Sequence, residues 1–256
     1  MEMTVLGCWA PYPRAGGACS GYLLQECGAA ILLEAGSGVL SRLAQVIDCW
    51  TLDAVVVTHF HHDHYLDLYP LRHAIEGARR EGKRSGPLLL YAPAEPAEVF
   101  SQLAGYSKAF DVVPLESLPA EEIREGLSVR RVAIGGLLFH FAPALHPLPC
   151  YSVSVTGSGR LVYSADTART PAAAAFAAGA DLFLCEASGL DRDADYLKGS
   201  HLTAREAGEI AREAGVRRLL ITHFWPEYDP QVLRGLAEAG FGGAVTAARE
   251  GETYKV

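Results

Sequence analysis

The fold is decided by the stretch Val55-Val56-Val57-Thr58-His59-Phe60-His61-His62-Asp63-His64, an apolar run followed at once by five side chains that can bind metals. The apolar run predicts a buried β-strand, and extended backbone would point His59 and His61 the same way. Imidazole and carboxylate groups at this density would all need polar partners if they were packing residues. The stretch therefore predicts a metal site for zinc, iron or manganese at the end of a buried strand.

A second copy of the pattern lies near the other end of the chain, in Leu219-Leu220-Ile221-Thr222-His223-Phe224. Open α/β folds place their chemistry where strands end. We therefore expect His59 and His223 to lie at equivalent strand ends, in two similar halves that face one site. The alternative is a chance likeness between two apolar strands.

Short apolar runs and helix-like segments alternate along the rest of the chain. Strands are predicted at 3–6, 22–24, 30–33, 54–57, 87–91, 151–155, 161–164, 182–185 and 218–222. Apolar residues at helical spacing predict helices over 38–49, 65–80, 95–104 and 171–178. Because the strands are nearly all apolar, they should be buried on both faces, which favours an α/β or layered α-β-β-α architecture. No Pro-rich or Ser-rich linker divides the chain, so residues 1–256 are predicted to form a single domain.

Composition excludes several classes of protein. The chain has 22 Lys and Arg against 30 Asp and Glu, a formal net charge of -8, so we expect no stable complex with nucleic acid through bulk electrostatics. Hydrophobic residues make up 50% of the chain, which excludes a disordered protein. The longest uncharged stretch, 132–159, contains prolines and histidines, which argues against a membrane span. Scattered cysteines and the lack of a secretory signal predict a cytoplasmic protein.

The order H-x-H-x-D-H after a buried strand resembles the signature of the metallo-β-lactamase fold hydrolases. The resemblance extends to His146 in Ala144-Leu145-His146-Pro147, to Asp166 after the strand at 161–164, and to His223. It implies the fold of that family, a four-layer αβ/βα sandwich of two mixed β-sheets flanked by helices. The turn at 32–38 fits the family's early Asp-x-Gly element, except that Glu34 stands where Asp is usual, a departure that concerns the surroundings of the ligands.

Carried over to this chain, the resemblance implies a binuclear centre of two divalent metal ions, with zinc preferred over manganese or iron. The implied ligands form two groups that share one carboxylate: His59, His61 and His146 for one ion, Asp63, His64 and His223 for the other, and Asp166 for both. Hydrolysis would proceed through a hydroxide that bridges the two ions, and Asp63 or Asp166 would orient it or accept its proton. The remaining histidines are expected to be structural: His62, His73 and His140.

The segment 200–215 bears on the class of substrate. Thr203 and Glu206 make a capping box and Gly215 is a natural helix end, so a helix should begin just after His201. Free backbone N–H groups at a helix start favour an anion, and His201 beside them could protonate a departing oxygen. The alternative is that His201 merely precedes a cap on the surface.

This segment resembles the His-x-Thr loop of the ribonuclease Z group, and Cys185-Glu186-Ala187-Ser188 resembles the His-Glu-Ala-Thr loop of that group, with Cys185 in place of its first histidine. The resemblance implies phosphodiester chemistry, in which His201 protonates the leaving oxygen and Glu186 orients His201. Only 19 residues separate His146 from Asp166, too few for the long arm with which ribonuclease Z enzymes grasp tRNA. We therefore expect a phosphodiesterase for a small or flexible substrate, such as a cyclic nucleotide, a cyclic phosphate or a short RNA.

Other functions stay open. A carboxylic ester, lactone or thioester hydrolase would use the same metals, with less need for an anion site at a helix start. A non-catalytic metal-bound sensor or interaction protein has no reason to keep every ligand, and redox chemistry at a di-iron centre lacks an accompanying flavin or iron-sulfur motif. As partners we expect a small-molecule or short nucleotide substrate and no membrane. A homodimer is a further expectation, with Pro87 to Tyr91 as one candidate interface.

Overall fold

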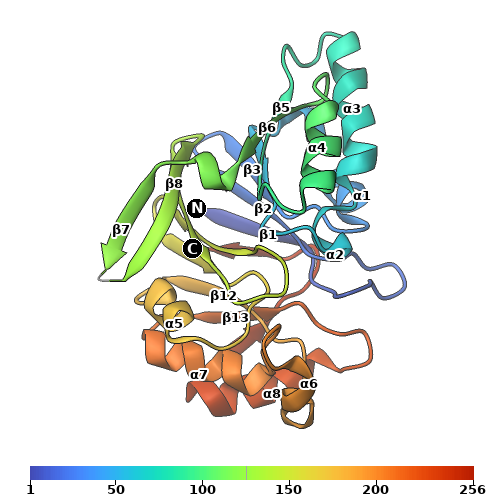
Figure 1. The fold of residues 1–256 in the computed structure, drawn as a ribbon. Helices are drawn as coiled ribbons and strands as arrows, with labels where there is room; N and C mark the ends of the chain where they lie inside the picture. Colours follow the sequence, from blue (N-terminus) through green and yellow to red (C-terminus); the bar gives the residue numbers. More distant parts are fainter. Residues whose placement is uncertain (125) are drawn as a thin grey trace.

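The computed structural model of the protein describes residues 1–124 and 126–256, whose strands form two mixed sheets (Figure 1). The first sheet has the order β15-β1-β2-β3-β4-β5-β6, from β1 (Glu2–Gly7), β2 (Gly21–Glu26), β3 (Ala29–Leu33), β4 (Ala54–Val56), β5 (Leu88–Ala92), β6 (Phe110–Pro114) and β15 (Thr253–Lys255). The second has the order β14-β13-β12-β11-β10-β9-β8-β7, from β7 (Ala120–Arg124), β8 (Leu127–Ile134), β9 (Leu137–Pro143), β10 (Tyr151–Thr156), β11 (Arg160–Tyr163), β12 (Leu182–Glu186), β13 (Leu219–Thr222) and β14 (Val245–Ala247).

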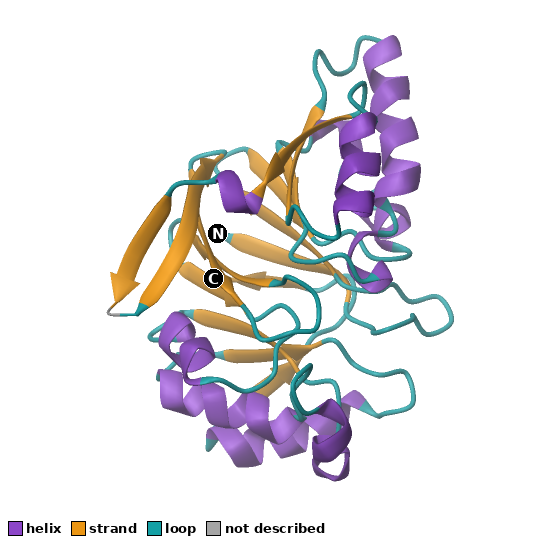
Figure 2. Cartoon of the chain, in the orientation of Figure 1, coloured by secondary structure: helices purple, strands orange, loops and turns teal. Residues whose placement is uncertain are grey.

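Helices cover the outer face of each sheet (Figure 2). Beside the first sheet lie α1 (Val39–Leu43), α2 (His62–Tyr65), α3 (Leu68–Arg80) and α4 (Ala97–Gly105). Beside the second lie α5 (Pro171–Ala177), α6 (Ala194–Leu197), α7 (Ala204–Ala214) and α8 (Pro230–Phe241). Three short 3₁₀ turns complete the described elements: η1 (Cys49–Thr51), η2 (Leu115–Ser117) and η3 (Asp191–Asp193). The predicted sandwich of two mixed sheets flanked by helices is confirmed.

The two buried faces of the first sheet follow from strand alternation. Successive side chains of β3 point to opposite faces, so Ile31 and Leu33 join a cluster that includes Phe139 of the second sheet. Leu32 joins a separate cluster, with Leu68 of α3. All three β3 side chains are buried, which is why the strand reads as a continuous apolar run.

The sequence predicted no strand for β6, β7, β8, β9, β14 or β15 and no helix for α6 or α8, and the boundaries of the predicted helices also differ from those observed. The helix predicted over 38–49 ends at Leu43, because Val39 and Leu43 bury their side chains whereas Val46 is 44% exposed. The helix predicted over 65–80 is divided into α2 and α3. The helix after Thr203 is confirmed: its capping box is formed, and Gly215 ends it in the left-handed region at a φ of 60°.

The segment Pro87 to Tyr91, predicted as one candidate interface, lies inside the first sheet. It forms most of β5, which pairs with β4 on one side and β6 on the other, and Leu88 and Leu90 are fully buried. No helix in the described part of the chain is long and apolar enough to span a membrane.

Candidate functional site

Strands from both sheets end around one cluster of polar side chains. Glu34 follows β3 and His59 lies just beyond β4 in the first sheet, while Asp166, Glu186 and His223 stand at the ends of β11, β12 and β13 in the second. All five are almost completely buried. His59 and His223 follow strands of different sheets, yet both contact Asp166, at 3.4 and 3.1 Å, so the two Thr-His-Phe segments face a common site, as their pattern predicted.

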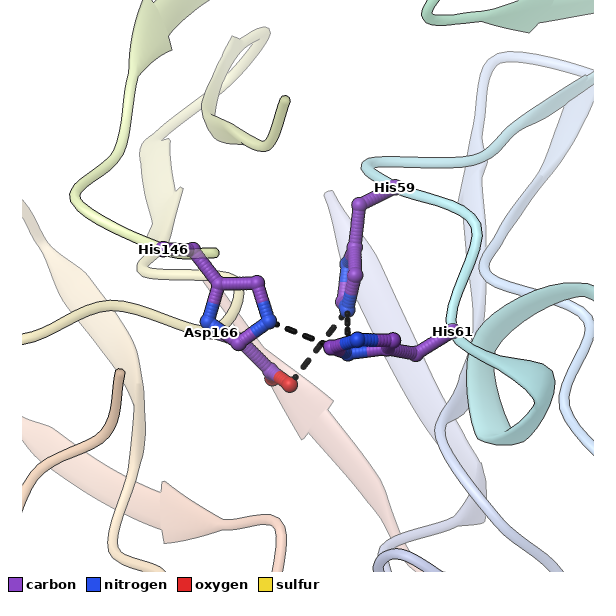
Figure 3. Close-up of side chains that lie close together, drawn as sticks. All are labelled: His59, His61, His146 and Asp166. Carbon is purple, nitrogen blue, oxygen red and sulfur yellow. Dashed lines mark hydrogen bonds and ion pairs between the residues drawn. The ribbon is translucent and has the colours of Figure 1, made fainter. Parts of the chain in front are cut away.

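The first group of candidate metal ligands comes from three separate segments (Figure 3). His59 Nε2 lies 3.2 Å from His61 Nδ1, and His146 Nε2 lies 3.0 Å from the same His61 atom. The carboxylate of Asp166 completes the group at 3.4 Å from His59 Nε2. The structure therefore brings together the four side chains that the sequence assigned to one ion.

The second group lies directly beside the first. His64 Nε2 lies 3.3 Å from His223 Nε2, and Asp63 Oδ2 lies 3.4 Å from His223 and 3.5 Å from His64. Asp166 faces this group too, with Oδ1 3.1 Å from His223 Nε2 and Oδ2 3.4 Å from His64 Nε2. Asp166 is thus the side chain common to both groups, as the sequence predicted.

The donor atoms of both groups fit divalent cations. Imidazole nitrogens aim at one another at 3.0 to 3.3 Å, a spacing at which at most one of each pair can carry a proton. Among the described residues, His64 Nδ1 and Asp166 Oδ1 are buried without a hydrogen bond, although both lie near ionisable neighbours. Nitrogen and carboxylate oxygen are the ligands that zinc, manganese and iron share.

The pKa values of the cluster are shifted in opposite directions at its two groups of histidines. Burial lowers the pKa of His59 to about 3 and that of His61 to about 4, which keeps both rings neutral as metal binding requires. Burial acts in the same direction on His223, but the carboxylate of Asp166 outweighs it and raises the pKa to about 10. Burial opposes ionisation of Asp166, yet the imidazoles around it hold its pKa well below the usual value. The carboxylate of Asp166 is therefore ionised, and it stabilises positive charge on His64 and His223.

Further buried groups orient the candidate ligands. Glu34 accepts hydrogen bonds from the backbone N–H and the hydroxyl of Thr58, and its Oε1 lies 3.4 Å from His64 Nδ1. Ser188 Oγ lies 2.9 Å from His223 Nδ1. Glu34, which departs from the family's usual Asp, therefore reaches His64 from behind, as partners of ligating histidines do.

Three residues at the site hold a left-handed backbone conformation that is uncommon for residues with side chains. Glu34, Ala165 and His223 have φ values of 65°, 52° and 63°. Such conformations cost on the order of 1 to 3 kcal/mol each and persist where surrounding structure enforces them. Their occurrence next to three strand ends indicates that these turns are shaped to aim the side chains of the cluster.

His201 and Glu186 form a pair at the edge of the cluster. His201 Nδ1 lies 3.2 Å from Glu186 Oε1, and Glu186 is fully buried. Burial would lower the pKa of His201, but the charge and hydrogen bond of Glu186 outweigh it and raise the pKa above its usual value. The ring lies 3.9 Å from Asp166 Oδ2, so it stands beside both groups of candidate ligands.

The prediction that the start of α7 binds an anion is wrong, because side chains occupy its backbone N–H groups. The N–H of Thr203 donates to the Glu206 carboxylate at 2.9 Å, and the N–H of Glu206 donates to the Thr203 hydroxyl at 3.2 Å. The N–H of Leu202 donates to Glu186 at 3.2 Å. The capping box thus occupies donors that would have bound an anion, and His201 lies beside the cluster rather than beside a free helix end.

A cavity of about 450 Å³ opens over the cluster and reveals residues that the sequence did not single out. It is lined by Pro11, His61, His62, Asp63, Asp166, Tyr196, Ser200, His201, His223 and Trp225. His62, expected to be structural, is exposed and faces this cavity. Trp225 directly follows the His223-Phe224 pair, which could have drawn attention to it, whereas the isolated Tyr196 carries no sequence signal. His73 and His140 do not line it.

Comparisons with known proteins agree on the type of fold. The model of the beta-lactamase superfamily domain matches residues 30–224. The chain is 34% identical to the probable metallo-hydrolase YhfI of Bacillus subtilis, over 100% of both proteins. The crystal structure of YhfI matches with a TM-score of 0.89 at 32% identity, over 99% of this chain and 98% of that one.

Ribonuclease Z proteins are similar as well. The ribonuclease Z of Streptomyces coelicolor is 29% identical over 97% of this chain and 95% of that protein. The crystal structure of the short form of human tRNase Z matches with a TM-score of 0.75 at 20% identity, over 100% of this chain and 99% of that one. At 20% identity, the similarity to the human structure shows a shared fold and nothing more.

Proposed function

Because the chain belongs to the β-lactamase superfamily of metallo-hydrolases, we propose that it is a phosphodiesterase that hydrolyses a small or flexible phosphodiester with two divalent metal ions, preferably zinc. Candidate substrates are a cyclic nucleotide, a cyclic phosphate and a short RNA. We propose the ligand sets His59, His61, His146 with Asp166, and Asp63, His64, His223 with Asp166. Bound there, the ions would supply Lewis acidity toward a phosphoryl oxygen and toward water.

The pair of His201 and Glu186 carries the assignment to phosphodiesters. Glu186 accepts from His201 Nδ1, which leaves Nε2 as the ring atom able to deliver a proton. His201 lines the cavity together with Asp63 and Asp166. An alkoxide that leaves phosphorus is a strong base and gains most from such a proton. Asp63 or Asp166, both of which line the cavity, would orient a water or accept its proton.

The size of the cavity supports a small substrate. A volume of about 450 Å³ lies within the range of small-molecule sites. Between His146 and Asp166 the chain forms β10 and β11, so no arm is available there to hold tRNA. The net charge of -8 adds no general attraction for a polyanion. The ribonuclease Z of Streptomyces coelicolor supports the reaction class by its name and its 29% identity.

Hydrolysis of bis(p-nitrophenyl) phosphate tests the proposal. Protein loaded with zinc or with manganese is assayed in parallel on this ester, a lactone and a thioester under identical conditions. We expect phosphodiester turnover that Asp166→Ala abolishes, because Asp166 belongs to the first group of candidate ligands and faces the second. Val232→Ala, an exposed position on α8 outside the cavity, serves as the control and should keep full activity.

A carboxylic ester, lactone or thioester hydrolase is the alternative that one observation favours. The capping box occupies backbone N–H groups at the start of α7 that were expected to bind an anion. That helix start therefore no longer favours an anionic phosphodiester over an uncharged ester. Turnover of the lactone or thioester without turnover of the phosphate ester would establish this alternative and contradict the phosphodiesterase.

A further inference from the structure

Two aromatic rings form one wall of the cavity, close to the histidine cluster. Tyr196 belongs to α6 and Trp225 follows β13 by three residues, and both line the cavity with His201 and His223. Their ring centroids lie 5.9 Å apart and their planes meet at 81°. We call this pair of perpendicular rings the aromatic corner.

The two rings of the aromatic corner differ in how firmly they are held. Trp225 stacks on Tyr228 at 5.8 Å with an angle of 19° between the planes, and the guanidinium of Arg192 lies 5.7 Å from the Tyr228 ring on which Trp225 rests. Tyr196 is 80% exposed, more than any other large hydrophobic residue exposed in the described part of the chain. A fixed ring beside an exposed ring leaves apolar aromatic surface available to a ligand.

We propose that the aromatic corner binds the nucleobase of a nucleotide phosphodiester whose phosphate lies at the histidine cluster. A flat base can stack on one ring and meet the other edge-on, the two geometries that aromatic groups prefer. The cavity of about 450 Å³ has room for one nucleotide unit. The choice of a phosphate-bearing ligand rests on the proposed function, since the phosphate is what the candidate ligands would engage.

Adenosine 5′-monophosphate and ribose 5-phosphate separate the base from the rest of the ligand. Both carry the same phosphate and sugar, and only the first carries a base. Calorimetric titration of the zinc-loaded protein should show about tenfold tighter binding of the nucleotide. Tyr196→Ala and Trp225→Leu should each remove most of this difference and leave the affinity for ribose 5-phosphate unchanged.

Two further variants test whether the rings act by stacking. Tyr196→Phe keeps the ring and should retain the preference for the nucleotide. Tyr12→Ala removes a contact to Glu227, in the same loop as Trp225, without removing a cavity residue, and it should also retain the preference. A loss in Tyr12→Ala equal to that in Tyr196→Ala would assign the effect to the loop and overturn the stacking role.

The inference and the proposed function can fail separately because this binding assay requires no turnover. Equal affinity for the nucleotide and ribose 5-phosphate in the unmodified protein would overturn the aromatic corner as a base site, even if bis(p-nitrophenyl) phosphate is hydrolysed. A tenfold preference for the nucleotide that the variants abolish would support the base site, even if no phosphodiester is cleaved, and only the proposed reaction would then be wrong.

Discussion

Glu186 shows how a buried carboxylate is made rigid. It is fully buried and accepts hydrogen bonds from the Thr167 N–H at 2.7 Å, the Ser188 hydroxyl at 2.6 Å and the Leu202 N–H at 3.2 Å, besides its contact with His201. Resemblance to a loop motif singled out Glu186 and His201 from the sequence. It could not supply the other donors, because they come from segments that only the fold brings together.

Replacement of His201 should act on proton delivery to the leaving group. We expect His201→Ala to lower the turnover of diphenyl phosphate about 100-fold and that of bis(p-nitrophenyl) phosphate far less, since p-nitrophenolate leaves without a proton. Glu186→Gln should follow the same trend through the orientation of His201. Metal content, measured by mass spectrometry, should stay unchanged in His201→Ala. Equal losses on both esters would exclude His201 as the acid.

The segment between β3 and α1 contacts the segment 59–67, which carries the H-x-H-x-D-H motif, and fixes its position. The N–H of Ala35 donates to the carbonyl of His64 at 2.7 Å, and the N–H of Leu40 donates to the Asp67 carboxylate at 2.7 Å. A Cβ added to Gly36 would lie 2.0 Å from the carbonyl oxygen of Asp63. The absence of a side chain at Gly36 thus permits the close approach that sets the position of Asp63 and His64.

Gly36→Ala should therefore both destabilise the protein and weaken metal binding. Overpacking at a backbone contact of this kind lowers the free energy of unfolding by about 1 to 3 kcal/mol. The matched control is Gly77→Ala within α3, where nothing lies within 4 Å of the added Cβ, and it should leave stability equal or slightly higher. Chemical denaturation and zinc titration of both variants measure the two effects. Similar behaviour of the two variants would contradict this role for Gly36.

Strands that are buried on both faces were the easiest elements to predict, for a physical reason. Inner strands such as β3 and β4 are buried on both faces, so their apolar runs are unmistakable. Strand β7 is exposed along most of its length and β8 alternates between buried and exposed positions, so neither forms such a run. Helix α1 is shorter than its apolar spacing suggested, because periodicity does not show which face meets a neighbour.

The two sheets share the site as well as the core. His59 and Asp63 come from the first sheet's side, whereas His146, Asp166 and His223 come from the second. The larger hydrophobic cluster contains residues of both sheets. The resemblance to the metallo-β-lactamase fold hydrolases implied the candidate ligands, but the cavity over them depends on side chains such as Tyr196 and Trp225, whose position follows from tertiary packing.

We propose that residues 1–256 unfold as one domain and that metal binding couples its two halves. A single thermal transition is expected, and zinc should raise its midpoint because the folded state alone assembles the ligands. Asp166→Ala should lose most of that increase. Scanning calorimetry with and without zinc provides the measurement. Two separate transitions, or an equal zinc effect in Asp166→Ala, would contradict the coupling.

The most direct measurement is a zinc titration of the metal-stripped protein, with phosphodiester turnover followed at each addition. The two groups of candidate ligands share Asp166 within one cluster, so full activity should require both to be filled. We expect turnover of bis(p-nitrophenyl) phosphate to rise to a plateau at about two zinc ions per chain. A plateau at one ion, or no phosphodiester turnover at any zinc content, would contradict a binuclear phosphodiesterase.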